Sequence, residues 1–208
     1  GGLPQPSPKL RWRQGVGAWH VDGPTAVAGG RVLFGSAFLD VEKKGERALL
    51  CLDAGDGKTV WKAPLKLNPW GGPTVAGDRV LVPSSSIRYD PQQVASAQGE
   101  VAAFALADGS QAWKRDVGAG VLGAVAVAGD RAVFADTGGR VQALDAKTGE
   151  TRWVYRGEAP FFGGPAVSGD TAYAADLKGV LHAIGLADGT RIWTLDLAQA
   201  LGAPGLVY

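Results

Sequence analysis

Short segments of alternating apolar and polar residues run through the chain, separated by turns rich in glycine and aspartate. Val141–Leu144 alternates in the way that a half-buried strand does. Gly129 and Asp130 form a turn pair upstream of it, because both residue types tolerate the backbone conformations of tight hairpins. The same stretch predicts further strands over residues 124–127, 131–135 and 150–155. No segment shows a helical period, so the pattern predicts four antiparallel strands in about 40 residues.

This four-strand unit repeats along the chain. A five-residue motif of the form Val-Ala-Gly-Asp-Arg recurs, with small variations, at residues 27–31, 75–79, 127–131 and 167–171. One tryptophan lies near the end of each of the four units, and a fifth precedes the first unit. With spacings of 49, 52, 40 and 40 residues, they are Trp12, Trp61, Trp113, Trp153 and Trp193. A four-stranded repeat of this length predicts an all-β protein, a β-propeller in which each unit is one four-stranded antiparallel blade.

Length differences between the units fall in one half of the repeat. The segment from each tryptophan to the end of the next five-residue motif spans 18 or 19 residues, whereas the remainder spans 22 to 34. The extra residues lie between the second and third predicted strands, at 37–47 in the first blade and 84–99 in the second. In an up-and-down blade, this connection and the loop before the first strand lie on the same face. The sequence therefore predicts one face that carries both insertions.

The predicted organisation is a linker followed by part of a ring. Residues 1–8 are rich in proline and glycine, which is typical of a linker. Residues 9–208 predict the propeller, with four complete blades at about 23–65, 71–117, 121–157 and 161–197. Leu10–Arg13 matches a fourth strand and Gly205–Tyr208 matches a first strand. This pattern favours part of a ring of about seven or eight blades, and the alternative is that copies self-associate through their open blade edges.

The segment Ala143–Trp153, which reads Ala-Leu-Asp-Ala-Lys-Thr-Gly-Glu-Thr-Arg-Trp, resembles the tryptophan-docking repeat of the PQQ-type β-propellers. That family comprises the quinoprotein dehydrogenases and their non-enzymatic relatives. Looser copies of the segment end at Trp61, Trp113 and Trp193. The resemblance implies that these tryptophans, like Trp12, pack between neighbouring blades, where an indole buries much apolar area and its N–H needs an acceptor. It also implies a periplasmic or otherwise extracytoplasmic location in a bacterium.

The resemblance implies two different functions. The non-enzymatic relatives include the propeller lipoprotein of the outer-membrane β-barrel assembly machine, and likeness to them implies an interaction scaffold with no cofactor. The quinoprotein dehydrogenases hold PQQ and Ca²⁺ at the ring centre, use an aspartate base and show a vicinal cysteine pair. Cys51 is the single cysteine of this chain, so that pair is missing. We therefore favour a non-catalytic scaffold, and a fragment of a PQQ- and Ca²⁺-dependent oxidoreductase is the alternative.

Charge and residue usage narrow the classes of partner. A formal net charge of +1 offers no basic surface for nucleic acid. No stretch approaches the roughly 20 apolar residues of a transmembrane helix. The chain has two histidines, His20 and His182, which are too few for the usual zinc site. No catalytic residue and no metal site is predicted, and a protein partner is the class that the sequence favours.

Aromatic and charged residues gather in the loops of the predicted insertion-bearing face. Exposed aromatics beside long loops are typical of surfaces that bind proteins or small ligands. The candidates are Trp19, His20, Trp70, Phe161 and Phe162 before the first strands, with Arg88 and Tyr89 in the second insertion. In the alternative interpretation the aromatics fill the inner wall of the ring and the insertions are solvated loops. A sugar or small-ligand site would require Trp19, Trp70 or Phe162 to be exposed.

Overall fold

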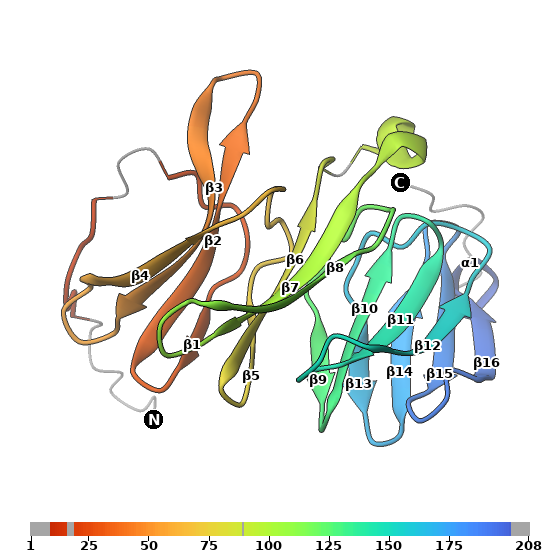
Figure 1. The fold of residues 1–208 in the computed structure, drawn as a ribbon. Coiled ribbons are helices and arrows are strands. Elements are labelled where there is room, and N and C mark those ends of the chain that lie inside the picture. The colour runs from red at the N-terminus through yellow and green to blue at the C-terminus, as the bar shows by residue number, and fades with distance from the viewer. Residues whose placement is uncertain (1–8, 16–18, 89, 201–208) are drawn as a thin grey trace, which may run out of the picture.

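The computed structural model describes residues 9–15, 19–88 and 90–200, and these fold into four antiparallel four-stranded sheets (Figure 1). Each sheet consists of four strands that are consecutive in the chain and hydrogen-bonded in chain order. The first blade contains β1 (Ala26–Ala28), β2 (Arg31–Leu39), β3 (Lys44–Asp53) and β4 (Thr59–Pro64). The second contains β5 (Thr74–Ala76), β6 (Arg79–Ser85), β7 (Gly99–Ala105) and β8 (Gln111–Asp116).

The third and fourth blades repeat this plan with shorter connections. The third contains β9 (Ala126–Ala128), β10 (Arg131–Asp136), β11 (Arg140–Asp145) and β12 (Thr151–Arg156). The fourth contains β13 (Ala166–Ser168), β14 (Thr171–Ala175), β15 (Val180–Gly185) and β16 (Arg191–Asp196). Two short helices were not predicted: the 3₁₀ helix η1 (Pro91–Ser96) in the second insertion and α1 (Leu197–Ala200) after β16.

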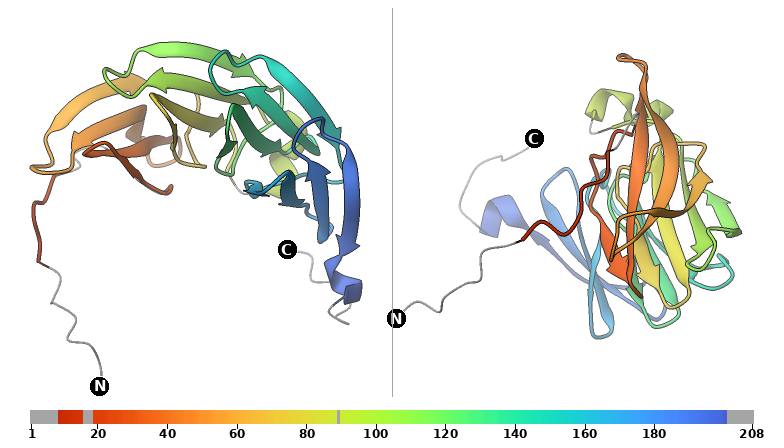
Figure 2. Two further views of the ribbon diagram at one scale, coloured as in Figure 1. Left: turned by 90° about the horizontal axis from the view of Figure 1, so that it is seen from below. Right: turned by 90° about the vertical axis from the view of Figure 1, so that its left-hand side faces the viewer.

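The four blades stand side by side along an arc, as the view from below shows (Figure 2). The short first strands β1, β5, β9 and β13 contact one another from blade to blade. Four antiparallel blades arranged in this way confirm the predicted β-propeller architecture.

The core consists of apolar layers between neighbouring blades. Between the first and second blades, Leu33 and Leu49 pack with Val80 and Val82, and all four side chains are fully buried. Along β6 the intervening Leu81 is also fully buried and packs at the boundary between the second and third blades, because successive side chains of a strand point to opposite faces of the sheet. Because both faces of an inner blade meet a neighbour, each boundary depends on the blade beside it, as in other repeat proteins.

A tryptophan on the last strand of a blade reaches across each of these boundaries. Its indole Nε1 donates a hydrogen bond to a backbone carbonyl in the turn between the third and fourth strands of the next blade. The pairs are Trp61 with Leu106 at 3.0 Å, Trp113 with Ala146 at 3.1 Å and Trp153 with Leu186 at 2.9 Å. Each indole thus gains both a large contact area and a hydrogen-bond acceptor.

A glycine in the receiving turn makes room for each indole. At Gly149 the backbone has φ of +73°, and a Cβ there would lie 2.6 Å from Cδ2 of Trp113. Both the positive φ and the contact with the ring exclude a larger residue. The contact between blades therefore requires both the tryptophan and a glycine in the turn between the third and fourth strands of the next blade.

The two ends of the described chain differ from the interior blades. Leu10–Arg13 is not a strand, contrary to the prediction, because no third strand lies beside it to complete a hydrogen-bonded ladder. Trp12 nevertheless donates from Nε1 to the carbonyl of Ala54 at 2.9 Å. At the other end, Trp193 is 42% exposed and packs on Tyr173 of its own blade. The first strand expected at Gly205–Tyr208 lies outside the described residues.

Candidate interaction face

Both insertions project from the same face of the propeller, at the top of Figure 1. Two isolated antiparallel bridges tie the loops before the first strands to this face. His20 pairs with Ala37 in the first blade, and Asn68 pairs with Ser85 in the second. The insertions and the loops before the first strands, which we call the lead-in loops, therefore form one continuous surface. We call this surface the insertion face.

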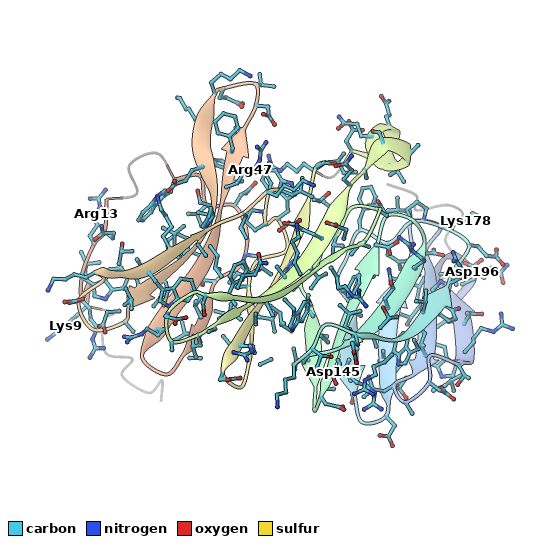
Figure 3. All side chains as sticks on the ribbon, viewed as in Figure 1. Lys9, Arg13, Arg47, Asp145, Lys178 and Asp196 are labelled. Atoms are coloured by element: carbon cyan, nitrogen blue, oxygen red, sulfur yellow. The ribbon has the colours of Figure 1, made fainter. Side chains whose placement is uncertain are left out.

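The first insertion extends the β2–β3 hairpin beyond the blade. Strands β2 and β3 continue beyond the blade and pair up to Leu39 and Lys44. The buried side chain of Asn68, from the second blade, fixes the base of the extension: Phe38 N donates to Asn68 Oδ1 at 2.9 Å, and Asn68 Nδ2 donates to Phe38 O at 3.0 Å. The Arg47 guanidinium lies over the Phe38 ring, 5.4 Å from its centroid (Figure 3 labels Arg47). The tip is open to solvent, with Val41 90% exposed.

The second insertion contains the short helix η1. Asp90 caps η1 by accepting a hydrogen bond from Gln92 N at 2.9 Å, and Pro91 occupies its first turn. The two arms of the insertion are joined because Ser86 N donates to Gln98 O and Gln98 N donates to Ser86 Oγ. The insertion is therefore hydrogen-bonded within itself, although most of its residues are exposed.

Arg88 links the second insertion to the first blade. Its guanidinium forms an ion pair with Asp22 in the first lead-in loop and lies over the Trp70 ring, 5.2 Å from the centroid. His20 Nε2 lies 3.9 Å from the same Asp22 carboxylate. The structure thus brings together His20, Trp70 and Arg88 from the predicted set, around an aspartate that the sequence analysis did not single out. A single acidic residue in a loop carries no sequence signal of such a role.

Trp19 lies at the edge of the insertion face, beside the hairpin. Its indole Nε1 donates to Glu46 Oε1, and its ring packs on Phe34 with centroids 5.9 Å apart. Glu46 also binds Lys62 Nζ at 3.0 Å. The ring is half-buried, so one side of it remains available to solvent.

The remaining predicted aromatics differ in how deeply they are buried. Phe161 is fully buried against His182, which removes it from the candidate surface. Trp70 is only 7% exposed and clusters with Ala37 and Leu122, against which the half-buried Phe162 also packs. Phe161 is therefore part of the core between the third and fourth blades, and Trp70 reaches the surface only at the edge of its ring. Tyr89 lies outside the described residues.

A polar network between the third and fourth blades was missed by sequence reasoning, which treated His182 only as a strand position. Its Nε2 lies 3.1 Å from Asp176 Oδ2 and its Nδ1 lies 2.9 Å from the Tyr155 hydroxyl. Because an ionised carboxylate only accepts, Nε2 is the donor to Asp176, and in the neutral imidazole Nδ1 then accepts from the tyrosine hydroxyl. Burial raises the pKa of Tyr155 above its usual value. The signal in the sequence was the aspartate shared by equivalent turns, Asp136 and Asp176.

Calcium requires six or more converging oxygen ligands, and within residues 9–15, 19–88 and 90–200 no three histidine, cysteine, aspartate or glutamate side chains come together in a metal-binding arrangement. Cys51 is buried, and this burial raises the pKa of its thiol. No helix in the part of the chain that the structure describes is long and apolar enough to cross a membrane.

Solved structures with similar folds include BamB and quinohemoprotein alcohol dehydrogenases. BamB from Moraxella catarrhalis has a TM-score of 0.64 and 20% identity, over 84% of this chain and 50% of that one. Quinohemoprotein alcohol dehydrogenase ADHIIG from Pseudomonas putida HK5 has a TM-score of 0.68 and 16% identity, over 90% and 36%. The corresponding enzyme from Comamonas testosteroni has a TM-score of 0.62 and 15% identity, over 85% and 35%. The chain thus spans half or less of the length of these three relatives.

Sequence comparison is more specific than these fold similarities. A search of curated protein sequences finds no match. The sequence model of one protein family, described as "Outer membrane protein assembly factor BamB", matches residues 3–95 and 97–206. That match covers nearly the whole chain, including all four blades, and the chain therefore belongs to this family of PQQ-type β-propellers.

Proposed function

We propose that the chain is a non-catalytic interaction scaffold that binds a protein partner through its insertion face. The observation that carries this proposal is that both insertions project from one face and are held there by contacts between blades. Asn68 fixes the hairpin across the first boundary, and Arg88 fixes the second insertion to Asp22. A preorganised surface loses less conformational entropy on binding than a mobile one.

The chemistry of the insertion face suits a protein partner. It offers an exposed apolar residue at Val41, a half-buried indole at Trp19 and the cation of Arg88. Aromatic residues and arginine are enriched where proteins bind each other. The family description names an outer-membrane assembly factor, and we propose accordingly that the scaffold acts in the periplasm. A fragment of a PQQ- and Ca²⁺-dependent oxidoreductase is the second candidate, because solved quinohemoprotein alcohol dehydrogenases share the fold.

The repeat itself supplies the variants that test the proposal. In the third blade, Thr-Gly-Gly connects Asp136 to Arg140. One variant would carry Thr-Gly-Gly in place of residues 37–47, and the second would carry it in place of residues 85–99. If the insertion face binds the partner, affinity capture from periplasmic extract should lose the partner with either variant, provided that circular dichroism shows a folded chain. Capture of the same proteins by both variants and the unmodified chain would contradict the proposal.

A further inference from the structure

A pocket of about 230 Å³ lies at the boundary between the third and fourth blades, around the Asp176–His182 pair. Its base is the Asp176 carboxylate, whose side chain is only 1% exposed. Asp176 lies at the end of β14, in the tight turn that occupies the position of the insertions in the first two blades. The pocket therefore opens on the same end of the blades as the insertion face, and its interpretation rests on the proposed scaffold function.

At the boundary between the second and third blades, an arginine side chain occupies the place that corresponds to this pocket. In the third blade, Asp136 Oδ2 accepts from Arg140 Nε at 2.9 Å and from Gln142 Nε2 at 2.7 Å. The same Arg140 guanidinium also donates to the backbone carbonyl of Val117 in the second blade, at 2.9 Å. A buried carboxylate is thus neutralised by an arginine that bridges two blades.

The fourth blade has the equivalent carboxylate, that of Asp176, but no arginine at the position of Arg140. Asp176 Oδ1 accepts from Lys178 N at 2.9 Å and Val180 N at 3.0 Å, as Asp136 Oδ1 does from the backbone of its own turn. Val180 stands where Arg140 stands in the repeat, and Gly157 stands at the position of Val117. The short valine leaves the space that the arginine fills one blade earlier, and His182 is the one side chain that bonds to Asp176 Oδ2 among the described residues.

The other charges around the pocket lie nearer to solvent. Arg156, Lys178 and Arg191 line it, together with Glu158 and Asp196 (Figure 3 labels Lys178 and Asp196). The three cations are exposed, so solvent and salt screen them. The Asp176 carboxylate is buried and therefore acts on a ligand with less screening. The deepest charge of the pocket is negative, which favours a cation over an anion at its base.

We propose that this pocket binds a guanidinium group, supplied by an arginine side chain of a protein partner. The arginine would take the position in trans that Arg140 takes within the chain, with its guanidinium on Asp176. A planar guanidinium can contact a carboxylate and a carbonyl together, whereas an ammonium is a point charge. The pocket should therefore prefer arginine to lysine.

The two histidines of the chain allow a direct test with small probes. In protein labelled with ¹³C-histidine, N-acetyl-arginine amide should shift the ring signals of His182 in a saturable way and leave those of His20 unchanged. N-acetyl-lysine amide should bind at least tenfold more weakly. Saturable binding of inorganic phosphate instead would make the pocket an anion site, and absence of any arginine-dependent shift would make it purely structural; either result overturns the proposal. Tighter binding of free arginine than of the blocked amide would overturn the assignment to a protein partner.

Two variants test the role of the boundary itself. Val180→Arg supplies the missing guanidinium within the chain and should abolish the arginine-dependent shift, while Val27→Arg, which adds the same charge at a position 70% exposed in another blade, should not. Asp176→Asn keeps an acceptor for the turn, removes the charge and should weaken arginine binding at least tenfold. Unchanged arginine binding in both pocket variants would refute the proposal. Because these probes need no partner, they give an answer even if trimming the insertions shows that the scaffold function is wrong.

Discussion

At the scale of single residues, one indole nitrogen and one glycine define each blade boundary. Trp153 is 6% exposed and bonded to Leu186 of the next blade, whereas Trp193 is 42% exposed and contacts its own blade. The two tryptophans are equivalent in the sequence repeat, but their different surroundings should give them different contributions to the free energy of unfolding. The positions of these tryptophans were readable from the sequence, but their acceptor carbonyls were not, because a backbone acceptor leaves no residue signature.

Replacing Trp153 with alanine should therefore destabilise the chain far more than replacing Trp193. We expect a loss of about 3–5 kcal/mol for Trp153→Ala, the range of large-to-small changes in a packed core. Trp193→Ala should cost about 1 kcal/mol, because much of that ring already contacts water. Urea unfolding followed by circular dichroism measures both. Equal losses for the two variants would mean that the contact between blades contributes nothing specific.

Asp145 should make part of the stability depend on acid pH. The Arg152 guanidinium and the backbone N–H of Thr148 lower its pKa from 3.8 to about 2. A carboxyl with a lower pKa in the folded state contributes its stability fully above the unfolded value of 3.8 and loses it as the pH falls through about 2. Asp145→Asn should thus have a lower urea midpoint than the unmodified chain at neutral pH. The difference between the two midpoints should shrink as the pH falls from about 3.8 to about 2. A difference that does not change with pH would contradict this assignment.

At the scale of elements, the repeat gives the strands and the insertions, but not how the insertions fold. The alternation of residues 141–144 and the turn at Gly129-Asp130 predicted β9, β10 and β11 to within a few residues. The hairpin extension and η1 were not predicted, because Asn68, Arg88 and Asp22 act across a blade boundary. Such contacts follow from tertiary structure and have no local periodicity.

Asn68 should control the order of the hairpin extension. Asn68→Ala removes both hydrogen bonds to Phe38 and leaves that backbone without its partners, which should cost about 1–3 kcal/mol. Hydrogen exchange across residues 37–47 should become faster, while exchange in β10 and β11 should remain as before. Unchanged exchange in the hairpin would show that the extension is held by its own strand pairing alone.

Comparison of the blades also predicts a stabilising change. Arg31 pairs with Asp53 at 2.8 Å, whereas the equivalent partner of Arg79 in the strand register is Ala105, and the buried Arg79 Nε has no hydrogen-bond partner among the described residues. Arg79 already lies 3.5 Å from the exposed Asp78 carboxylate, and Ala105→Asp should add a second carboxylate opposite it in the strand register and raise stability by up to about 1 kcal/mol. The gain should fall as salt rises in urea unfolding. A loss of stability at every salt concentration would mean that this turn cannot hold the pair.

At the scale of the whole molecule, four blades form an arc whose two insertions stand on one face (Figures 1 and 2). The sequence predicted this arrangement because insertion lengths locate the variable half of each repeat. It did not separate exposed from buried aromatics, since Trp70 and Phe161 precede the same kind of glycine turn as the half-buried Phe162. Which ring faces the neighbouring blade depends on packing that the repeat alone does not encode.

The scaffold account predicts no response to the cofactor of the dehydrogenases. A ligand that binds the folded state at 100 times its Kd stabilises it by about 2.7 kcal/mol. Thermal unfolding with PQQ and Ca²⁺ should therefore give the same midpoint as without them. A clear rise in the midpoint would favour the oxidoreductase interpretation.

The most direct test of the account is site-specific photocrosslinking on the insertion face. A benzophenone amino acid would replace Val41 at the hairpin tip or, as a control, Val27 beside the Gly29–Gly30 turn at the opposite end of the blade; both are exposed, at 90% and 70%. If the insertion face binds a protein partner, position 41 should give a discrete protein adduct that is absent from position 27. The yield of this adduct should fall when Asn68→Ala loosens the hairpin. Adducts of equal yield from both positions, or none from position 41, would contradict the claim that the insertion face binds a protein partner.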